Sequence, residues 1–179
     1  PAMLPRSVLE KAQSELTNWN GLGTSVMEIS HRSKAFMAVA EKAEEDLRNL
    51  LSIPNNYKVL FMQGGGSGQF FSVPLNLGKP GNPAQHLVSG QWYQIAVDEA
   101  SKYMKSEVVA TNYVKEGKIN VPEQSTWEVN AKAAYFHYCP NETVDGIEIN
   151  WVPKTGNIPL VADMSSNILS KSINIADYG

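Results

Sequence analysis

Apolar positions repeat with helical spacing in two stretches near the amino terminus. Residues 6–17 place four apolar side chains on one helix face: Val8, Leu9, Ala12 and Leu16. Residues 34–51 place a longer set on one face: Phe36, Val39, Ala40, Ala43, Leu47, Leu50 and Leu51. Charged side chains fill the other positions of the second stretch, which makes it the clearest amphipathic helix in the sequence.

From residue 58 onwards, short apolar runs alternate with helical stretches. The runs typical of strands are 58–62, 86–89, 107–111, 133–139 and 160–163. The first of them, KVLFM, has no polar alternation and predicts a strand that is buried on both faces.

Two helices are predicted between these strands. One begins near Ser67, and Pro74 should kink it or end it. The other covers 91–105, whereas residues 114–125 are polar and predict a loop. This alternation indicates an α/β fold with a mostly parallel sheet. Ligands bind beyond the carboxyl ends of such strands, which directs attention to the segments after Met62, Cys139 and Leu160.

Composition narrows the classes of function. The 179 residues carry a net charge of −3, with 42% hydrophobic and 18% charged residues, an ordinary globular balance for about one domain. No basic stripe points to nucleic acid, and no run of 18 apolar residues could span a membrane. The single cysteine favours a reducing, cytoplasmic location, although a presequence before Pro1 stays possible. A start without methionine and an end at Gly179 suggest a fragment.

The strongest candidate site is the run from Gln63 to Phe70, which reads QGGGSGQF. A strand that passes through glycines into a helix N-terminus offers free N–H groups to a phosphate. The residues after Gly68 match neither an ATP-binding P-loop nor the dinucleotide fingerprint. A tight turn without a ligand is the alternative.

Other candidates are more ambiguous. Arg32, beside His31, could bind a carboxylate or phosphate, but an N-cap at Ser33 with two exposed neighbours explains the segment equally simply. Trp92 could stack on a ligand ring, although a core anchor is the commoner role. Asp163 follows a strand and suits catalysis, cofactor contact or turn capping.

Metal binding has little support in the sequence. The three histidines, His31, His86 and His137, show no ligand spacing, and Cys139 has no paired partner. His137 alternates within an apolar strand, so we interpret it as a core histidine whose hydrogen bonds are satisfied.

Seven segments occur in the order found in one enzyme family: PAMLP, SVMEISHRS, FMQGGGSGQF, VPLNL, SGQW, CPNETVDGIE and VADMSSNILSK. The chain therefore resembles the phosphoserine aminotransferases, fold-type I enzymes of the class V aminotransferases that use pyridoxal 5′-phosphate (PLP). The resemblance implies a three-layer α/β/α sandwich. It assigns residues 1–15 to the small domain or an arm, and 16–179 to most of the PLP-binding large domain.

The resemblance also implies roles for individual residues. The backbone of Gly66 and Ser67 would bind the PLP phosphate, and Trp92 would stack on the pyridine ring. Thr143 would lie near the ring hydroxyl. The Asp163 carboxylate would pair with the protonated ring nitrogen, so Asp163 and Trp92 are the expected catalytic residues.

The resemblance assigns substrate binding to His31 and Arg32. The implied reaction transfers an amino group between glutamate and 3-phosphohydroxypyruvate, giving O-phosphoserine and 2-oxoglutarate in serine biosynthesis, in a homodimer. Two alternatives stay open: a class V aminotransferase that uses another 2-oxo acid, and an inactive binding or dimerisation module.

Two positions depart from the family pattern. The family's Schiff-base lysine lies beyond the position of Gly179, and Lys171 corresponds to a different residue of the family. Ser172 stands where a proline is common. The resemblance thus implies that these 179 residues alone are inactive.

Overall fold

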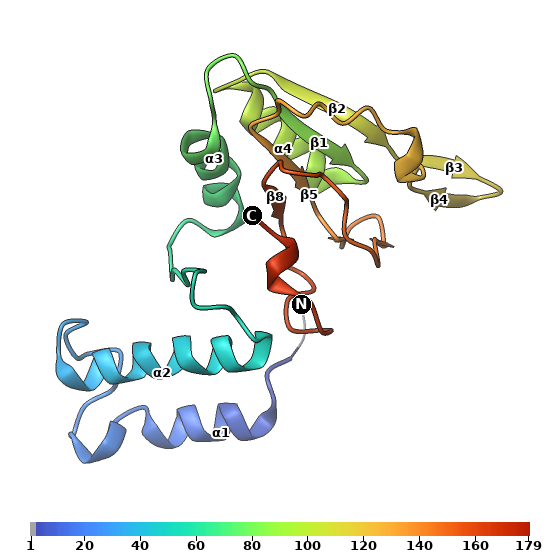
Figure 1. Ribbon diagram of the computed structural model, residues 1–179. Helices are drawn as coiled ribbons and strands as arrows, with labels where there is room; N and C mark the ends of the chain where they lie inside the picture. The colour runs from blue at the N-terminus through green and yellow to red at the C-terminus, as the bar shows by residue number, and fades with distance from the viewer. Residues whose placement is uncertain (1–2) are drawn as a thin grey trace. The chain divides into compact units, whose positions relative to one another are not determined.

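The computed structural model describes residues 3–179, which Figure 1 shows as a ribbon. The chain divides into two compact units, Pro1–Ile53 and Pro54–Gly179. The sequence-based boundary after residue 15 concerns the small and large domains of the family, and it stays a prediction.

The first unit is helical, as the apolar spacing predicts. It contains α1 (Arg6–Glu15), a short 3₁₀ helix (Trp19–Gly21) and α2 (Lys34–Leu51). The Ser33 side chain accepts a hydrogen bond from the Phe36 N–H at 3.2 Å, so Ser33 is the N-cap of α2. The amphipathic helix over 34–51 is confirmed at both ends.

The second unit is built on a four-stranded parallel sheet. Its strands are β1 (Ala84–Val88), β2 (Ser106–Thr111), β5 (Tyr135–Tyr138) and β8 (Leu160–Ala162). They lie in the order β2-β1-β5-β8, and His86 of β1 is in register with His137 of β5. Four of the predicted strands are thereby confirmed, with small shifts in their ends.

Helices α3 (Gly65–Leu77) and α4 (Gln91–Ser101) pack against each other beside this sheet. Phe70 of α3 and Tyr93 of α4 both meet the His137 ring, which assigns the two helices to one face. On the other face Trp127 stacks on Phe136 with ring centroids 5.9 Å apart. The predicted α/β fold class is confirmed.

Pro74 does not end α3, which continues to Leu77. Within 114–125, expected to be a loop, the structure has a hairpin of β3 (Tyr113–Lys115) and β4 (Lys118–Asn120). A second small hairpin joins β6 (Asn141–Glu142) to β7 (Ile147–Glu148). The remaining elements are short 3₁₀ helices at Gln124–Thr126 and Ile175–Asp177.

The predicted strand at 58–62 is wrong. The segment is irregular, and the exposed fractions of Leu60, Phe61 and Met62 are 73%, 66% and 65%. A parallel strand needs a neighbour for its hydrogen bonds, and none of the described strands pairs with this segment. An apolar run alone therefore did not determine a strand here.

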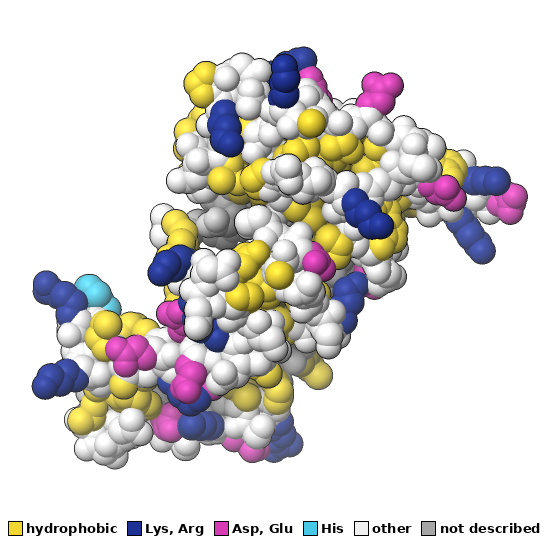
Figure 2. Space-filling model, viewed as in Figure 1, with side chains coloured by type: hydrophobic (Ala, Val, Ile, Leu, Met, Phe, Trp, Pro, Cys, Tyr) yellow, Lys and Arg dark blue, Asp and Glu magenta, His cyan; other side chains and the backbone are white. Residues whose placement is uncertain are grey.

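The visible surface carries charged side chains of both signs. Figure 2 shows basic and acidic side chains interspersed on the visible face, without a continuous basic stripe. Among residues 3–179, no helix is both long and apolar enough to cross a membrane.

Candidate functional site

The direction of α3 brings its amino terminus to the carboxyl edge of the sheet. Near its end, Val73 and Leu77 pack against a buried cluster of Ala84, Ala134 and Tyr135, where β1 and β5 begin. One or two turns earlier, Phe70 meets His137 in the middle of β5, with ring centroids 6.2 Å apart. The first turn of α3 therefore lies toward the edge at which the parallel strands end.

The glycine run forms that first turn. Gly64, the N-cap, has φ +107°, and a Cβ there would lie 3.2 Å from Gly68 Cα, so a larger residue would be strained and crowded. The helix begins at Gly65, and the N–H of Gly68 is bonded to the Gly64 carbonyl at 2.9 Å.

The N–H groups of Gly66 and Ser67 precede the first possible intrahelical bond, and no described residue accepts a hydrogen bond from them. They are therefore free for an anion, as the sequence predicts, although the helix begins two residues before Ser67. A Cβ on Gly66 would meet nothing within 4 Å, so the approach to its backbone is open.

Trp92 lies at the start of α4, directly beyond the carboxyl end of β1. Its side chain is neither fully buried nor fully free, with 37% of the residue exposed. The indole Nε1–H donates a hydrogen bond to Thr143 Oγ1 at 3.2 Å. Two candidates separated by 51 positions in sequence are therefore in direct contact, and Trp92 is not simply a core anchor.

Glu142 belongs to the segment after Cys139 to which the sequence directs attention, but the sequence predicts no role for this residue. It is completely buried, and its carboxylate accepts hydrogen bonds from the N–H groups of Trp92 and Tyr93 at 3.2 and 3.1 Å. Burial raises the pKa of Glu142, while the two backbone donors oppose that rise. A glutamate beside the candidate Thr143 was the only signal in the sequence.

Asp163 follows β8 at the same edge, and its N–H donates to the Tyr138 carbonyl at 3.0 Å. Carboxylate Oδ1 accepts hydrogen bonds from the Ser165 N–H and Oγ–H, at 3.0 and 2.5 Å. Within the described chain, no hydrogen bond engages Oδ2. Asp163 thus caps its own turn and keeps one oxygen for another partner.

Cys139 lies beneath this edge at the end of β5. The thiol is buried and donates to the Asn141 carbonyl at 3.4 Å. Burial, followed by the charges of Asp163 and Glu142, raises the pKa of the Cys139 thiol to about 12. A thiol with such a pKa is a poor nucleophile at neutral pH, so Cys139 is a structural residue.

His137 is in the core, but its hydrogen bonds are not satisfied as expected. No described group bonds its Nδ1, nor either ring nitrogen of neighbouring His86. The two rings are 5.7 Å apart, on the side of the sheet that carries α3 and α4. Burial lowers the pKa of His86 to about 3 and that of His137 to about 4, so both are neutral.

His31 and Arg32 lie in the turn before α2, and both are exposed. The simpler interpretation of this segment, an N-cap at Ser33, is confirmed. Since His31 and Arg32 belong to the first unit and the other candidates to the second, their part in the site stays a prediction.

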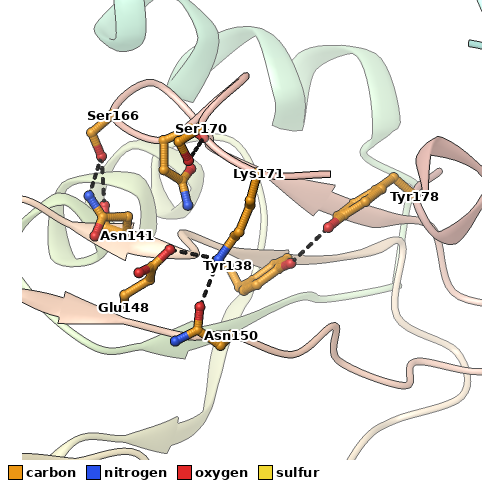
Figure 3. Close-up of polar contacts among 9 residues, drawn as sticks. Tyr138, Asn141, Glu148, Asn150, Ser166, Ser170, Lys171 and Tyr178 are labelled. Carbon is orange, nitrogen blue, oxygen red and sulfur yellow. Dashed lines mark hydrogen bonds and ion pairs between the residues drawn. The ribbon is translucent and has the colours of Figure 1, made fainter. Parts of the chain in front are cut away.

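Figure 3 shows that the Lys171 amine is occupied. Lys171 Nζ lies 2.6 Å from Glu148 Oε1 and 2.9 Å from Asn150 Oδ1. Nearby, the hydroxyls of Tyr138 and Tyr178 are 3.3 Å apart. Lys171, Asn150 and the two tyrosines line a cavity of about 280 Å³, which Ser172 also lines. Nothing in the structure explains why serine occupies the position of Ser172.

The described residues contain no group of three or more histidine, cysteine or acidic side chains that could hold a metal ion. The site thus consists of free amides on α3, a half-exposed indole on α4, the Thr143 hydroxyl and one free oxygen of Asp163. These groups suit an anionic, flat ligand with a basic ring atom.

Comparisons with known proteins identify the family of the chain. The family model "Aminotransferase class-V" matches residues 1–179. Phosphoserine aminotransferases of Pseudomonas syringae pv. syringae and pv. tomato are each 52% identical over the whole chain. The chain spans 49% of their length, about half of these curated relatives.

Two solved structures have the same fold. Phosphoserine aminotransferase from Bacillus circulans subsp. alkalophilus has a TM-score of 0.94 and 38% identity, covering 100% of this chain and 49% of its own. The PLP-bound enzyme from Trichomonas vaginalis has a TM-score of 0.91 and 39% identity, covering 100% of this chain and 50% of its own. The chain belongs to the class V aminotransferase family.

Proposed function

We propose that this chain forms the cofactor-binding part of a phosphoserine aminotransferase. The whole enzyme would transfer an amino group between glutamate and 3-phosphohydroxypyruvate. The observation that carries the proposal is that free amides of Gly66 and Ser67, the Trp92 indole and the Asp163 carboxylate gather at one sheet edge. The 52% identity to curated phosphoserine aminotransferases supports it.

The residues present fit PLP. The free N–H groups at the start of α3 would hold its phosphate, and the half-exposed indole of Trp92 offers a flat face for its ring. Oδ2 of Asp163 would accept a hydrogen bond from the protonated ring nitrogen. When bound, PLP would supply an electron-withdrawing ring, and the Asp163 carboxylate would keep the ring nitrogen protonated.

Thr143 would orient the ring through its hydroxyl. Because Thr143 Oγ1 accepts the indole N–H of Trp92, its own proton is left to donate to a ring oxygen. One side chain thereby links the stacking residue to the ring edge. His31 and Arg32 remain our candidates for the carboxylate or phosphate of the substrate.

The lysine that anchors the cofactor is proposed to lie outside these 179 residues. Lys171 does not suit the role, since its amine is paired with Glu148. The chain alone would then hold PLP weakly, without turnover. The assembly we propose for the complete enzyme is a cytoplasmic homodimer.

Borohydride reduction of the complete enzyme with PLP, followed by peptide mapping, tests the anchor. We expect the label on a peptide outside residues 1–179. A label on Lys171 with turnover intact would contradict the proposal. A panel of phosphorylated and plain 2-oxo acids then separates phosphoserine aminotransferase from a class V enzyme with another substrate, and turnover of none of them supports an inactive module.

A further inference from the structure

The β6–β7 hairpin contacts Trp92 at two points. The Glu142 carboxylate accepts the main-chain N–H of Trp92, and Thr143 Oγ1 accepts its indole N–H, both at 3.2 Å. A tryptophan side chain has two rotatable bonds, so holding its backbone and its far end fixes the plane of the ring. Adjacent residues of one hairpin thus control both ends of one side chain.

Glu142 is well suited to hold the backbone of Trp92 in place. It has no solvent-exposed surface, and its second oxygen accepts the Tyr93 N–H at 3.1 Å. Pairing of Glu142 with Ile147 holds its backbone in the hairpin. A carboxylate that accepts two amides of a helix's first turn also satisfies donors that have no partner within that helix.

Gly90 shows how closely this contact is packed. Its φ of −176° is open to any residue, yet a Cβ would lie 2.6 Å from Glu142 Cδ and 2.5 Å from Asp145 Oδ2. Glycine is required there to admit the two carboxylates. Since Glu142 is buried, it could not turn away from a larger neighbour.

The same hairpin is tied to the Asp163 turn. Asn141 Nδ2 donates to Ser166 Oγ at 2.9 Å, three residues after Asp163 (Figure 3). Lys171 binds Glu148 of β7 from the chain beyond that turn. The hairpin therefore joins the stacking residue to the residue proposed for the ring nitrogen.

We propose that Glu142 is a positioning residue that fixes the plane of the Trp92 indole by holding the first turn of α4. The inference deepens the proposed function and rests on it only where the ring stacked on Trp92 is that of PLP. The hydrogen bonds themselves belong to the free protein, so they can be examined without any ligand.

The test compares Glu142→Gln with Asp145→Ala. The glutamine keeps the volume and one acceptor but turns an NH₂ group toward one of the two amides. Asp145 provides a matched control because it caps the neighbouring Gln91 N–H at 2.9 Å, on the same helix. Within residues 3–179, the hydrogen bonds of Trp92 go to Glu142 and Thr143 and not to Asp145. Hydrogen exchange of the assigned amides and of the Trp92 indole N–H is measured by NMR in the complete enzyme without PLP.

We expect Glu142→Gln to raise exchange at Trp92 or Tyr93 and at the indole about tenfold, while Gln91 is unchanged. Asp145→Ala should show the reverse pattern. Exchange is measured equally far below each variant's thermal midpoint, so that loss of global stability is excluded. Equal effects of the two variants, or an unchanged indole in Glu142→Gln, would overturn the inference.

The second readout is PLP binding to the complete enzyme. It is measured by quenching of tryptophan fluorescence, with Trp92→Phe as the reference. Glu142→Gln should weaken PLP binding about tenfold more than Asp145→Ala does, and equal affinities would contradict the inference. Binding to none of the proteins would count against the proposed function, and the exchange pattern would still decide the positioning role of Glu142.

Discussion

Gly90 illustrates how a single missing side chain can determine a local structure. Gly90→Ala should destabilise the protein by about 1–3 kcal/mol, because the methyl group would overlap two carboxylates that hold α4. Urea unfolding measures the change. Gly66→Ala is the matched control, since its methyl group would meet nothing within 4 Å inside a helix. An equal loss in both variants would argue against crowding as the cause.

Asp163 makes a separate prediction about chemistry. In the complete enzyme, Asp163→Ala should abolish transamination while the thermal midpoint changes little, since within residues 3–179 the carboxylate bonds only Ser165 of its own turn. Turnover and melting are measured on the same preparation. Near-normal turnover would rule out a role for Asp163 in keeping the ring nitrogen protonated.

The residues of the site differed in how far the sequence could reveal them. The aspartate after a strand lies where expected. The glycines instead form the first turn of α3 and follow an irregular segment in place of the predicted strand. The role of Glu142 depends on the N–H groups of Tyr93 and Trp92, which are 49 and 50 positions away, so no local sequence pattern could predict it. Its burial and its two amide donors could be seen only in the folded chain.

At the scale of elements, the buried pair on β1 and β5 predicts acid sensitivity. His86 and His137 have pKa values lowered to about 3 and about 4, against an ordinary value of 6.5. Below pH 6.5 the two histidines bind protons in the unfolded chain but stay neutral in the folded chain. Stability is therefore fully present above pH 6.5 and is lost as the pH falls toward 4, by up to about 2.7 kcal/mol per pH unit.

Unfolding free energy measured from pH 7 to pH 4 checks this. His137→Phe should reduce the pH dependence by about one proton. An unaltered slope in His137→Phe would show that other groups dominate acid unfolding.

Helix α2 and the segment 58–62 show why some elements could be predicted and others not. The apolar face and the Ser33 cap of α2 act within a few residues, and both its ends were predicted correctly. A strand exists only through its neighbour, and 58–62 has none among the described strands. The apolar run is visible in the sequence, but the presence or absence of a neighbouring strand is not.

At the scale of the whole molecule, this unpaired run makes the chain prone to associate. Leu60, Phe61 and Met62 present three consecutive exposed apolar side chains, and large exposed apolar surfaces promote contact between molecules. Phe61→Glu should reduce self-association measured by sedimentation velocity, with an unchanged thermal midpoint. Val114→Glu, also exposed, is the control and should have the smaller effect. Equal effects would point to net charge instead.

The buried thiol of Cys139 can be used to measure how often the site opens. Cys139 is the only cysteine of the chain and lies under the carboxyl edge of the sheet. An alkylating reagent must wait until that edge opens and the thiol ionises. The rate of modification at this one atom therefore reports the frequency of local opening. A ligand that binds against Trp92 and Asp163 should lower the rate of Cys139 modification in proportion to its occupancy.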